Sequence, residues 1–488
     1  MAITAGDNLN SVATSTQMTL VNNYIDFTAQ GTAGWAQQYL PDLMEKEAEV
    51  FGNRTVSGFL SQVGAEEAMS SDQVIWSEQG RLHLSYNGTL DVSANQITIG
   101  TDLDGNAGAA AHGIRVGDTI IVSSSRDGAT TQCYVKSRTA GGDTIVALPY
   151  KAALMSDAAA GTLTDGACKV FVYGSEFAKG TAGQTSSNEP VHKSFTNKPI
   201  ILKDFYQING SDASQIGWVE ISGEDGQNGY LWYLKAEGDT RSRFSDYVEM
   251  SMVESVRALA ASTIHDDSVY DGGGGAIANT DPGTEGLFAA IEDRGNLTSG
   301  VTGVNAATDL AEFDAILAEF DKQGAIEENM MFVNRATALA MDDMLASMNS
   351  HGAGGTSYGV FDNSEDMALN LGFSGFRRGS YDFYKSDWKY LNDNATRGGV
   401  VEASSAIRGV IIPAGVSSVY DQQLGKNLKR PFLHVRYRAG QTEDRKMKTW
   451  ITGSVGGNVT TDIDSMNVHY LSERCLVVQG ANNFMLMN

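Results

Sequence analysis

The chain has 488 residues, with 35 basic and 59 acidic side chains, a formal net charge of −24 and 42% hydrophobic residues. The acidic balance argues against binding of nucleic acid over a broad surface, because such binding needs clustered Lys and Arg against the phosphates. No apolar run approaches the ~18 residues of a membrane span. The first basic residue is Lys46, so we expect no signal peptide and no membrane partner.

The 54 Gly and only 7 Pro favour adaptable loops over rigid linkers. The three cysteines, Cys133, Cys168 and Cys475, are widely separated and lack CxxC spacing. Such spacing is typical of reduced structural thiols and not of a disulfide framework or a zinc site.

The first part of the chain changes pattern twice. Residues 1–34 are Ser, Thr, Asn and Gly-rich and predict an extended arm, and residues 35–71 predict a short helical segment. In Asp72–Tyr86 apolar residues alternate around Gln79-Gly80, which predicts a two-stranded ribbon. Residues 87–175 contain short strand-like runs separated by Gly, Asp and Ser turns, which predict an inserted β-barrel or β-sandwich.

The strongest helix signal runs from Gln227 to Leu259, with apolar residues three and four positions apart. Its core candidates are Phe244, Tyr247, Met252 and Val256. Further helices are expected at 309–322 and 336–348 with a strand at 329–333 between them, a mixed α/β pattern. Strand-like runs then follow at 400–402, 410–412, 432–438, 447–454, 466–470 and 475–479.

Four short motifs lack the context that their chemistry needs. Gly355–Gly359 matches the GxSxG elbow around Ser357, but no apolar strand precedes it and no helix pattern follows. The calcium-like Asp102–Asn106 lacks the Gly and Glu of such a loop. His265 has no second His at helical spacing, and Gly425-Lys426 lacks the following Ser or Thr of a phosphate loop. We therefore expect no cofactor, no enzymatic activity and no metal site at these motifs.

Basic residues concentrate between Lys426 and Lys448. This run is typical either of a solvated strand face or of an electrostatic contact. The partner in such a contact is either nucleic acid or an acidic copy of the same protein, and the net charge of −24 favours the copy. The assembly-interface candidates are Trp76, Arg81, Lys426, Lys429, Arg430, Arg436 and Arg438.

Three strings carry a resemblance to a known family: Tyr173–Gly180 (YGSEFAKG), Phe332–Arg335 (FVNR) and Val468–Arg474 (VHYLSER). With the order of elements, they make the chain similar to the larger major capsid proteins of tailed bacteriophages, the Johnson-fold family. The resemblance covers nearly the whole chain, except that the minimal fold lacks a counterpart of 87–175.

The resemblance implies an α+β chain with an arm, an extended loop, a spine helix with a peripheral sheet, and an α/β axial domain. The implied divisions are an arm at 1–34, a short helical segment at 35–71, an extended loop at 72–86 and 176–208, an inserted β-rich domain at 87–175, a peripheral domain with the spine helix at 209–284 and 456–488, and an axial domain at 285–455.

For function, the resemblance implies self-assembly as homo-hexamers and homo-pentamers into an icosahedral shell around double-stranded DNA, which is enclosed without sequence-specific binding. Portal and auxiliary or scaffolding proteins are the implied partners, and the implied location is the virion capsid, assembled in the host bacterial cytoplasm. Two alternatives stay open: a phage tail tube, sheath or fibre subunit, and a cytoplasmic serine hydrolase that uses Ser357.

Overall fold

The computed structural model describes residues 58–60, 65–80, 83–103, 105, 112–126, 128–139, 142–184, 187–188, 192–211, 231–259, 262, 264, 282–349, 374–401, 406–414, 416–421, 426–455 and 459–488. The chain divides into two compact units: unit 1 is Met1–Trp76 with Thr196–Asn488, and unit 2 is Ser77–Phe195. Strands predominate over helices in both. The expected arm at 1–34 lies outside the described residues.

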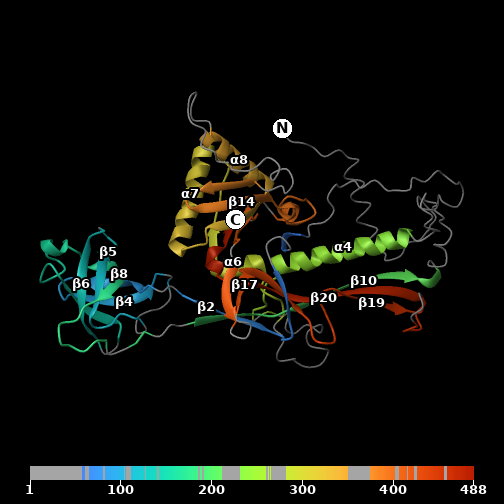
Figure 1. Cartoon of the computed structure of the whole chain (residues 1–488). Coiled ribbons are helices and arrows are strands. Elements are labelled where there is room, and N and C mark those ends of the chain that lie inside the picture. Colours follow the sequence, from blue (N-terminus) through green and yellow to red (C-terminus); the bar gives the residue numbers. More distant parts are fainter. Residues whose placement is uncertain are drawn as a thin grey trace. The chain divides into compact units, whose positions relative to one another are not determined.

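Unit 2 contains a closed barrel of six antiparallel strands in the order β3-β4-β7-β6-β5-β8 (Figure 1). Its elements are β3 (Ser85–Asp91), β4 (Gln96–Asp102), β5 (Asp118–Ser124), β6 (Thr130–Arg138), β7 (Thr144–Pro149), the 3-10 turn η3 (Ala158–Ala160) and β8 (Gly166–Ser175). Of the barrel and the sandwich that the sequence left open, the structure has the barrel. Alternate residues such as Ile97, Ile120 and Val135 point into its core and are fully buried.

Glycine at position 88 permits the close approach of β3 and β4, whose register shifts between Asn87 and Gly88. A Cβ at Gly88 would lie 2.6 Å from the carbonyl oxygen of Thr98. Two cysteines, Cys133 and Cys168, face the barrel core, where burial raises the pKa of the first to about 12 and of the second to about 11. With Cys475, all three are free and buried, as predicted for reduced structural thiols.

A two-stranded ribbon of β2 (Val74–Gln79) and β9 (His192–Asn197) carries both passages of the chain between the units. The prediction that Asp72–Tyr86 forms both strands of a ribbon, with a turn at Gln79-Gly80, is therefore wrong. The strand β2 pairs with β9, more than a hundred residues later, and Ser85 already begins β3 of the barrel.

The first sheet of unit 1 has the order β1-β18-β20-β10, with β19 also paired to β20. Its strands are β1 (Ala65–Met69), β10 (Ile200–Asn209), β18 (Leu433–Arg438), β19 (Lys448–Gly453) and β20 (Ser465–Val478). A short helical segment is predicted for residues 35–71, but residues 65–69 form the strand β1, which pairs in parallel with β18. Residues 35–57 lie outside the described part of the chain. The two runs predicted at 466–470 and 475–479 form one continuous strand, β20.

One long helix, α4 (Leu231–Glu254, 24 residues), packs against this sheet (Figure 1). Phe244 and Val248 contact Val468 and Tyr470 of β20. The helix runs through Gly238 without interruption but ends at Glu254, five residues before the predicted end. Among the core candidates, Phe244 and Met252 are buried.

The other two candidates from the α4 prediction are exposed. Tyr247 is 47% exposed because it lies away from the stripe that contains Phe244, Val248 and Met252, and Val256 is 67% exposed because it lies beyond the end of the helix. Both predictions of core positions are wrong for the single chain.

The second sheet of unit 1 has the order β11-β21-β15-β12-β14-β13. Its strands are β11 (Asn296–Thr298), β12 (Glu328–Val333), β13 (Ser374–Arg378), β14 (Tyr381–Asp387), β15 (Gly409–Pro413) and β21 (Met485–Met487). The surrounding elements are α6 (Leu287–Arg294), α7 (Ala306–Gln323), α8 (Arg335–Asn349), η6 (Lys389–Leu391), α10 (Arg397–Val400), η8 (Ala481–Asn483) and the hairpin β16 (Val416–Asp421) with β17 (Lys426–Pro431). The helices predicted at 309–322 and 336–348 correspond to α7 and α8. The strand predicted at 400–402 is wrong at Val400, which ends α10.

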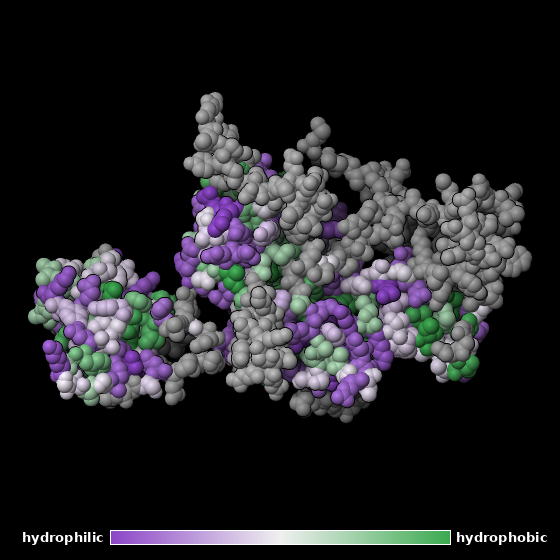
Figure 2. All heavy atoms as spheres, in the orientation of Figure 1, coloured by the Kyte–Doolittle hydropathy of each residue, from purple (hydrophilic) through white to green (hydrophobic). Residues whose placement is uncertain are grey.

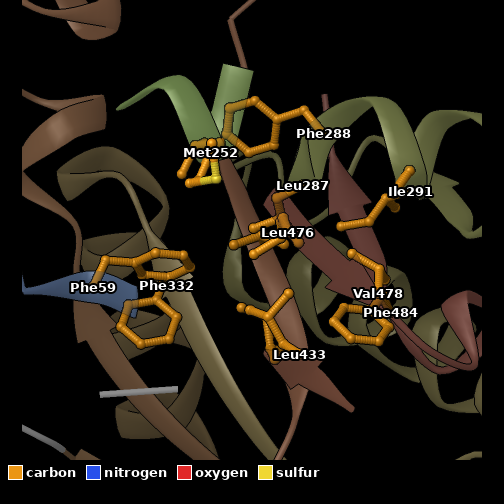
Figure 3. Close-up of a cluster of buried hydrophobic side chains, with 14 of the residues drawn as sticks. Phe59, Met252, Leu287, Phe288, Ile291, Phe332, Leu433, Leu476, Val478 and Phe484 are labelled. Atoms are coloured by element: carbon orange, nitrogen blue, oxygen red, sulfur yellow. The ribbon is translucent and has the colours of Figure 1, made fainter. Parts of the chain in front are cut away.

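A shared hydrophobic cluster joins the two sheets of unit 1 (Figure 3). Phe59 stacks on Trp388 with ring centroids 4.3 Å apart and meets Phe332 of β12 edge-on at 4.7 Å. Met252 of α4 and Leu476 of β20 lie in the same cluster. The segment near Phe59, the long helix and both sheets are therefore one packed body.

The boundary expected at 455 does not divide the two sheets. The strands β18 and β19, expected in the axial domain, belong to the first sheet with β20 and β10. Conversely, β21 near the carboxyl end belongs to the second sheet, between β11 and β15. The last strand-forming segments of the chain thus contribute to both sheets.

Candidate assembly site

The basic run between Arg436 and Lys448 pairs with acidic side chains of the same chain. Arg436 lies 2.7 Å from Glu67, and Arg438 pairs with Asp72. Arg445 lies 2.5 Å from Glu473, and Lys448 lies 2.5 Å from Glu443. The described cations of this run therefore have acidic partners within the chain, and the contact with a second copy stays a prediction.

Arg474 of β20 is the most buried cation of this network, at 7% exposed. Its Nε donates to Ser472 Oγ (2.8 Å), and its Nη2 donates to the carbonyl oxygen of Lys446 (2.7 Å). Its Nη1 lies 3.3 Å from Glu66 of β1, which also pairs with Lys446. Burial lowers the pKa of Arg474, and the carboxylates of Glu66 and Glu249 oppose that shift. The guanidinium thus ties together β1, β20 and the segment before β19.

Glu249 of α4 accepts hydrogen bonds from the start of the described chain. The backbone N–H of Gly58 donates to its carboxylate at 2.7 Å, and that of Leu60 donates at 3.1 Å. Burial raises the pKa of Glu249, and these backbone donors counteract part of the rise. The contact fixes the segment that places Phe59 in the shared core.

The raised pKa of Glu249 predicts a pH effect on stability. A carboxyl group whose folded pKa exceeds its unfolded value stabilises the fold below the unfolded pKa, and this contribution is lost as pH rises through the folded pKa. The stability of the wild type relative to Glu249→Gln should therefore be greatest near pH 4 and fall as pH rises above 4.5, by at most about 1.4 kcal/mol per pH unit. Urea unfolding at a series of pH values measures the difference.

Glu443 supplies a control of opposite sign, since its hydrogen bond to Lys448 lowers its pKa. Its contribution should weaken as the solution is acidified, so that the Glu443→Gln difference shrinks at low pH. If the Glu249→Gln difference instead grew with pH, the backbone donors and Arg474 would outweigh burial at this carboxylate.

The root of the ribbon within unit 1 is held by buried polar contacts. Asn197 is fully buried; its Nδ2 donates to the carbonyl oxygens of Leu476 (2.6 Å) and Glu285 (3.0 Å). Trp76 is 7% exposed, and the guanidinium of Arg294 lies over its ring at 5.6 Å. Arg294 also pairs with Glu285 at 2.6 Å. In the single chain, Trp76 is therefore part of an internal contact.

The carboxyl end of α4 is joined to the second sheet's surroundings through Glu254. The Tyr390 hydroxyl donates to its carboxylate at 2.7 Å, and Arg397 does so at 2.5 Å. Arg397 also lies over the ring of Phe288 at 5.1 Å. Burial raises the pKa of Tyr390, and Glu254 adds to the rise.

An open cleft of about 410 Å³ lies on the first sheet. Its lining is Asp72, Ile201, Arg438, Gly440, Glu443, Arg445 and Glu473. The charged groups of this lining pair with one another or with their neighbours, and Ile201 is 52% exposed. The cleft thus presents three acidic, two basic and one apolar side chain.

The structure brings together only some of the predicted interface residues. Arg436 and Arg438 lie in β18 beside the cleft, and Trp76 lies at the ribbon root. Arg81 and the side chains of Lys426, Lys429 and Arg430 lie outside the described part of the molecule, as do Ser357 and His265. Sequence reasoning missed Glu66, Glu249, Asn197 and Arg474, because no local pattern marks a polar residue whose partners are remote in sequence.

In the described part of the chain, three or more His, Cys, Asp or Glu side chains are nowhere grouped so that they could hold a metal ion. Over the same residues, each helix is too short or too polar to span a membrane.

No family model and no curated protein matches the sequence. Several solved structures are similar to the chain. A chain from the asymmetric unit of the bacteriophage PhiM1 mature capsid is 8% identical, with a TM-score of 0.39 and 95% of each chain covered. The capsid structure of cyanophage P-SCSP1u is 8% identical, with a TM-score of 0.37 and the same coverage. A chain of Microbacterium phage Oxtober96 is 7% identical, with a TM-score of 0.38 and with 95% of this chain and 99% of that chain covered.

Proposed function

We propose that the chain is a Johnson-fold major capsid protein that assembles as hexamers and pentamers into an icosahedral shell around double-stranded DNA. The order of elements carries the proposal: a paired ribbon, β10 of the first sheet, one long helix, an α/β region with α6 to α8, and a return to the first sheet through β18 to β20. This is the order that the family resemblance of the sequence implies.

Two physical features support a structural role. Ion pairs and buried polar groups connect distant segments of unit 1, so the side chains at the candidate site serve cohesion. The net charge of −24 suits a protein that encloses DNA without gripping it, since like charges repel. Location in the virion, assembly in the host cytoplasm, and portal and scaffolding partners belong to the same proposal.

Electron microscopy of the purified full-length chain tests the proposal directly. Negatively stained samples at rising protein concentration should contain closed shells of uniform diameter. Open tubes of constant width would assign the chain to a tail structure instead. Dispersed single chains at every concentration would overturn self-assembly.

A further inference from the structure

The charge of the molecule is distributed very unevenly between its two units. Unit 2 contains 9 basic and 11 acidic residues, a net charge of −2, so that unit 1 carries −22 of the total of −24. The acidic character of the chain therefore belongs almost wholly to unit 1.

Several exposed lysines of the barrel have no acidic partner among the described residues. In the first sheet of unit 1, Arg436, Arg438 and Arg474 pair with carboxylates, while the exposed Lys203 of β10 forms no ion pair with a described residue. On the barrel, Lys136 in β6, Lys151 after β7 and Lys169 in β8 are exposed. None of these three lysines forms an ion pair with any residue that the structure describes. Their charge is available to another molecule.

Exposed aromatic side chains lie on the same wall of the barrel. Along β8, Lys169, Phe171 and Tyr173 alternate with the buried Cys168 and Val170, so they point outward. Phe171 is 39% exposed and Tyr173 is 49% exposed. Strand β5 lies between β8 and β6, and its Ile121 is paired with Phe171 on one side and with Gln132 on the other.

The wall continues across β6 to the end of β7. Tyr134 of β6 is paired with Leu148, which is 38% exposed. Tyr150 is 49% exposed and donates its hydroxyl hydrogen to Glu176. Figure 2 shows hydrophobic and hydrophilic residues interspersed on the visible face of the barrel unit. Aromatic rings with surrounding lysines have the composition of an interface core with a charged rim.

We propose that the outer face of β8, β5 and β6 is a docking surface for the acidic unit 1 of a second copy of this chain. The proposal rests on the proposed shell. The local charge of this face identifies the occupant: Lys136 and Lys169 form no ion pair with a described residue, although unit 2 as a whole has a net charge of −2, and unit 1 of each copy has a charge of −22. Such a contact joins different surfaces of two copies, so it can close into rings around a symmetry axis.

Site-directed photocrosslinking of assembled shells tests the contact. The full chain carries p-benzoylphenylalanine in place of Tyr173, and isotopically light and heavy chains are mixed before assembly. Mass spectrometry should find mixed-isotope crosslinks from position 173 to peptides of unit 1. The same probe in place of Thr98, which is exposed on β4, serves as the control and should give few such crosslinks.

Charge reversal supplies a second measurement on the same shells. Lys136→Glu with Lys169→Glu should raise the protein concentration needed for assembly by about tenfold or more. Gln96→Glu, which adds a charge at an exposed position on β4, should leave it nearly unchanged.

The outcomes separate this inference from the proposed function. If the wild type forms no shells, the proposed function fails. If shells form but the double variant assembles like the wild type, or crosslinks from position 173 reach only barrel peptides, the docking inference alone is overturned. Capture of a neutral oligosaccharide at this face of assembled shells, without crosslinks to unit 1, would overturn it as well.

Discussion

Replacing Arg474 by Met is expected to lower the free energy of unfolding of unit 1 by about 2–4 kcal/mol, because the three hydrogen bonds of a buried guanidinium are lost and each contributes about 0.5–1.5 kcal/mol. Glu66 would lose its buried partner, and the Lys446 carbonyl oxygen and Ser472 Oγ would each lose a donor. Arg474→Lys should fall between the wild type and Arg474→Met, because an ammonium cannot reproduce the three-way fork of the guanidinium.

Tryptophan fluorescence during urea unfolding measures the free energy of unfolding of unit 1. All six tryptophans, Trp35, Trp76, Trp218, Trp232, Trp388 and Trp450, belong to unit 1. The measurement uses unassembled chains at low concentration. Arg377→Met is the matched control, since Arg377 is 65% exposed and lies 3.6 Å from Asp382; it should cost about 1 kcal/mol or less. Equal losses in the two Met variants would show that Arg474 is no more important than a surface pair.

The parts of the fold that follow from local side-chain period were predictable. Helices α7 and α8 appear where apolar residues recur at three- and four-residue intervals, and Phe313 and Phe320 of α7 are fully buried. The barrel strands appear where apolar and polar residues alternate. In both cases the face that meets the core can be read within one element.

The strands β1 and β20 show why other parts were missed. The segment Ala65–Met69, AEEAM, has the composition of a helix but pairs in parallel with β18, more than 360 residues later. In β20, Glu473 and Arg474 interrupt the apolar run and suggest a break, yet the strand continues because their charges are neutralised by Arg445 and Glu66. Tertiary pairing outweighs local preference in both strands.

The candidate site depends on pairings of this long-range kind. The sequence reveals that Arg436 and Arg438 lie in a basic run, but their partners, Glu67 and Asp72, precede them by more than 360 residues. A charge run seen without its partners appears available for an external contact. The barrel lysines did not stand out in the sequence because they are dispersed along it, although the structure places Lys136 on β6 and Lys169 on β8, the two strands that flank β5.

Replacing Ile120 by Asp should unfold the barrel while leaving unit 1 folded. Ile120 is fully buried among the apolar side chains of the barrel core. We expect the barrel to lose about 4 kcal/mol or more of stability, since a buried unpaired charge is among the most costly single changes. Ile121→Asp is the matched control: the neighbouring side chain points outward from β5 and should cost about 1 kcal/mol or less.

Thiol modification distinguishes the two units in this experiment. Cys133 and Cys168 lie in the barrel core, whereas Cys475 lies in β20 of unit 1, where burial raises its pKa to about 12. In unassembled Ile120→Asp chains, the two barrel thiols should react rapidly with a disulfide reagent while Cys475 stays protected. The tryptophan transition of unit 1 should shift by no more than about 0.5 kcal/mol, because changes in separate units are additive. Exposure of Cys475 together with the other two would mean that the ribbon transmits unfolding and that the barrel is not an independent folding unit.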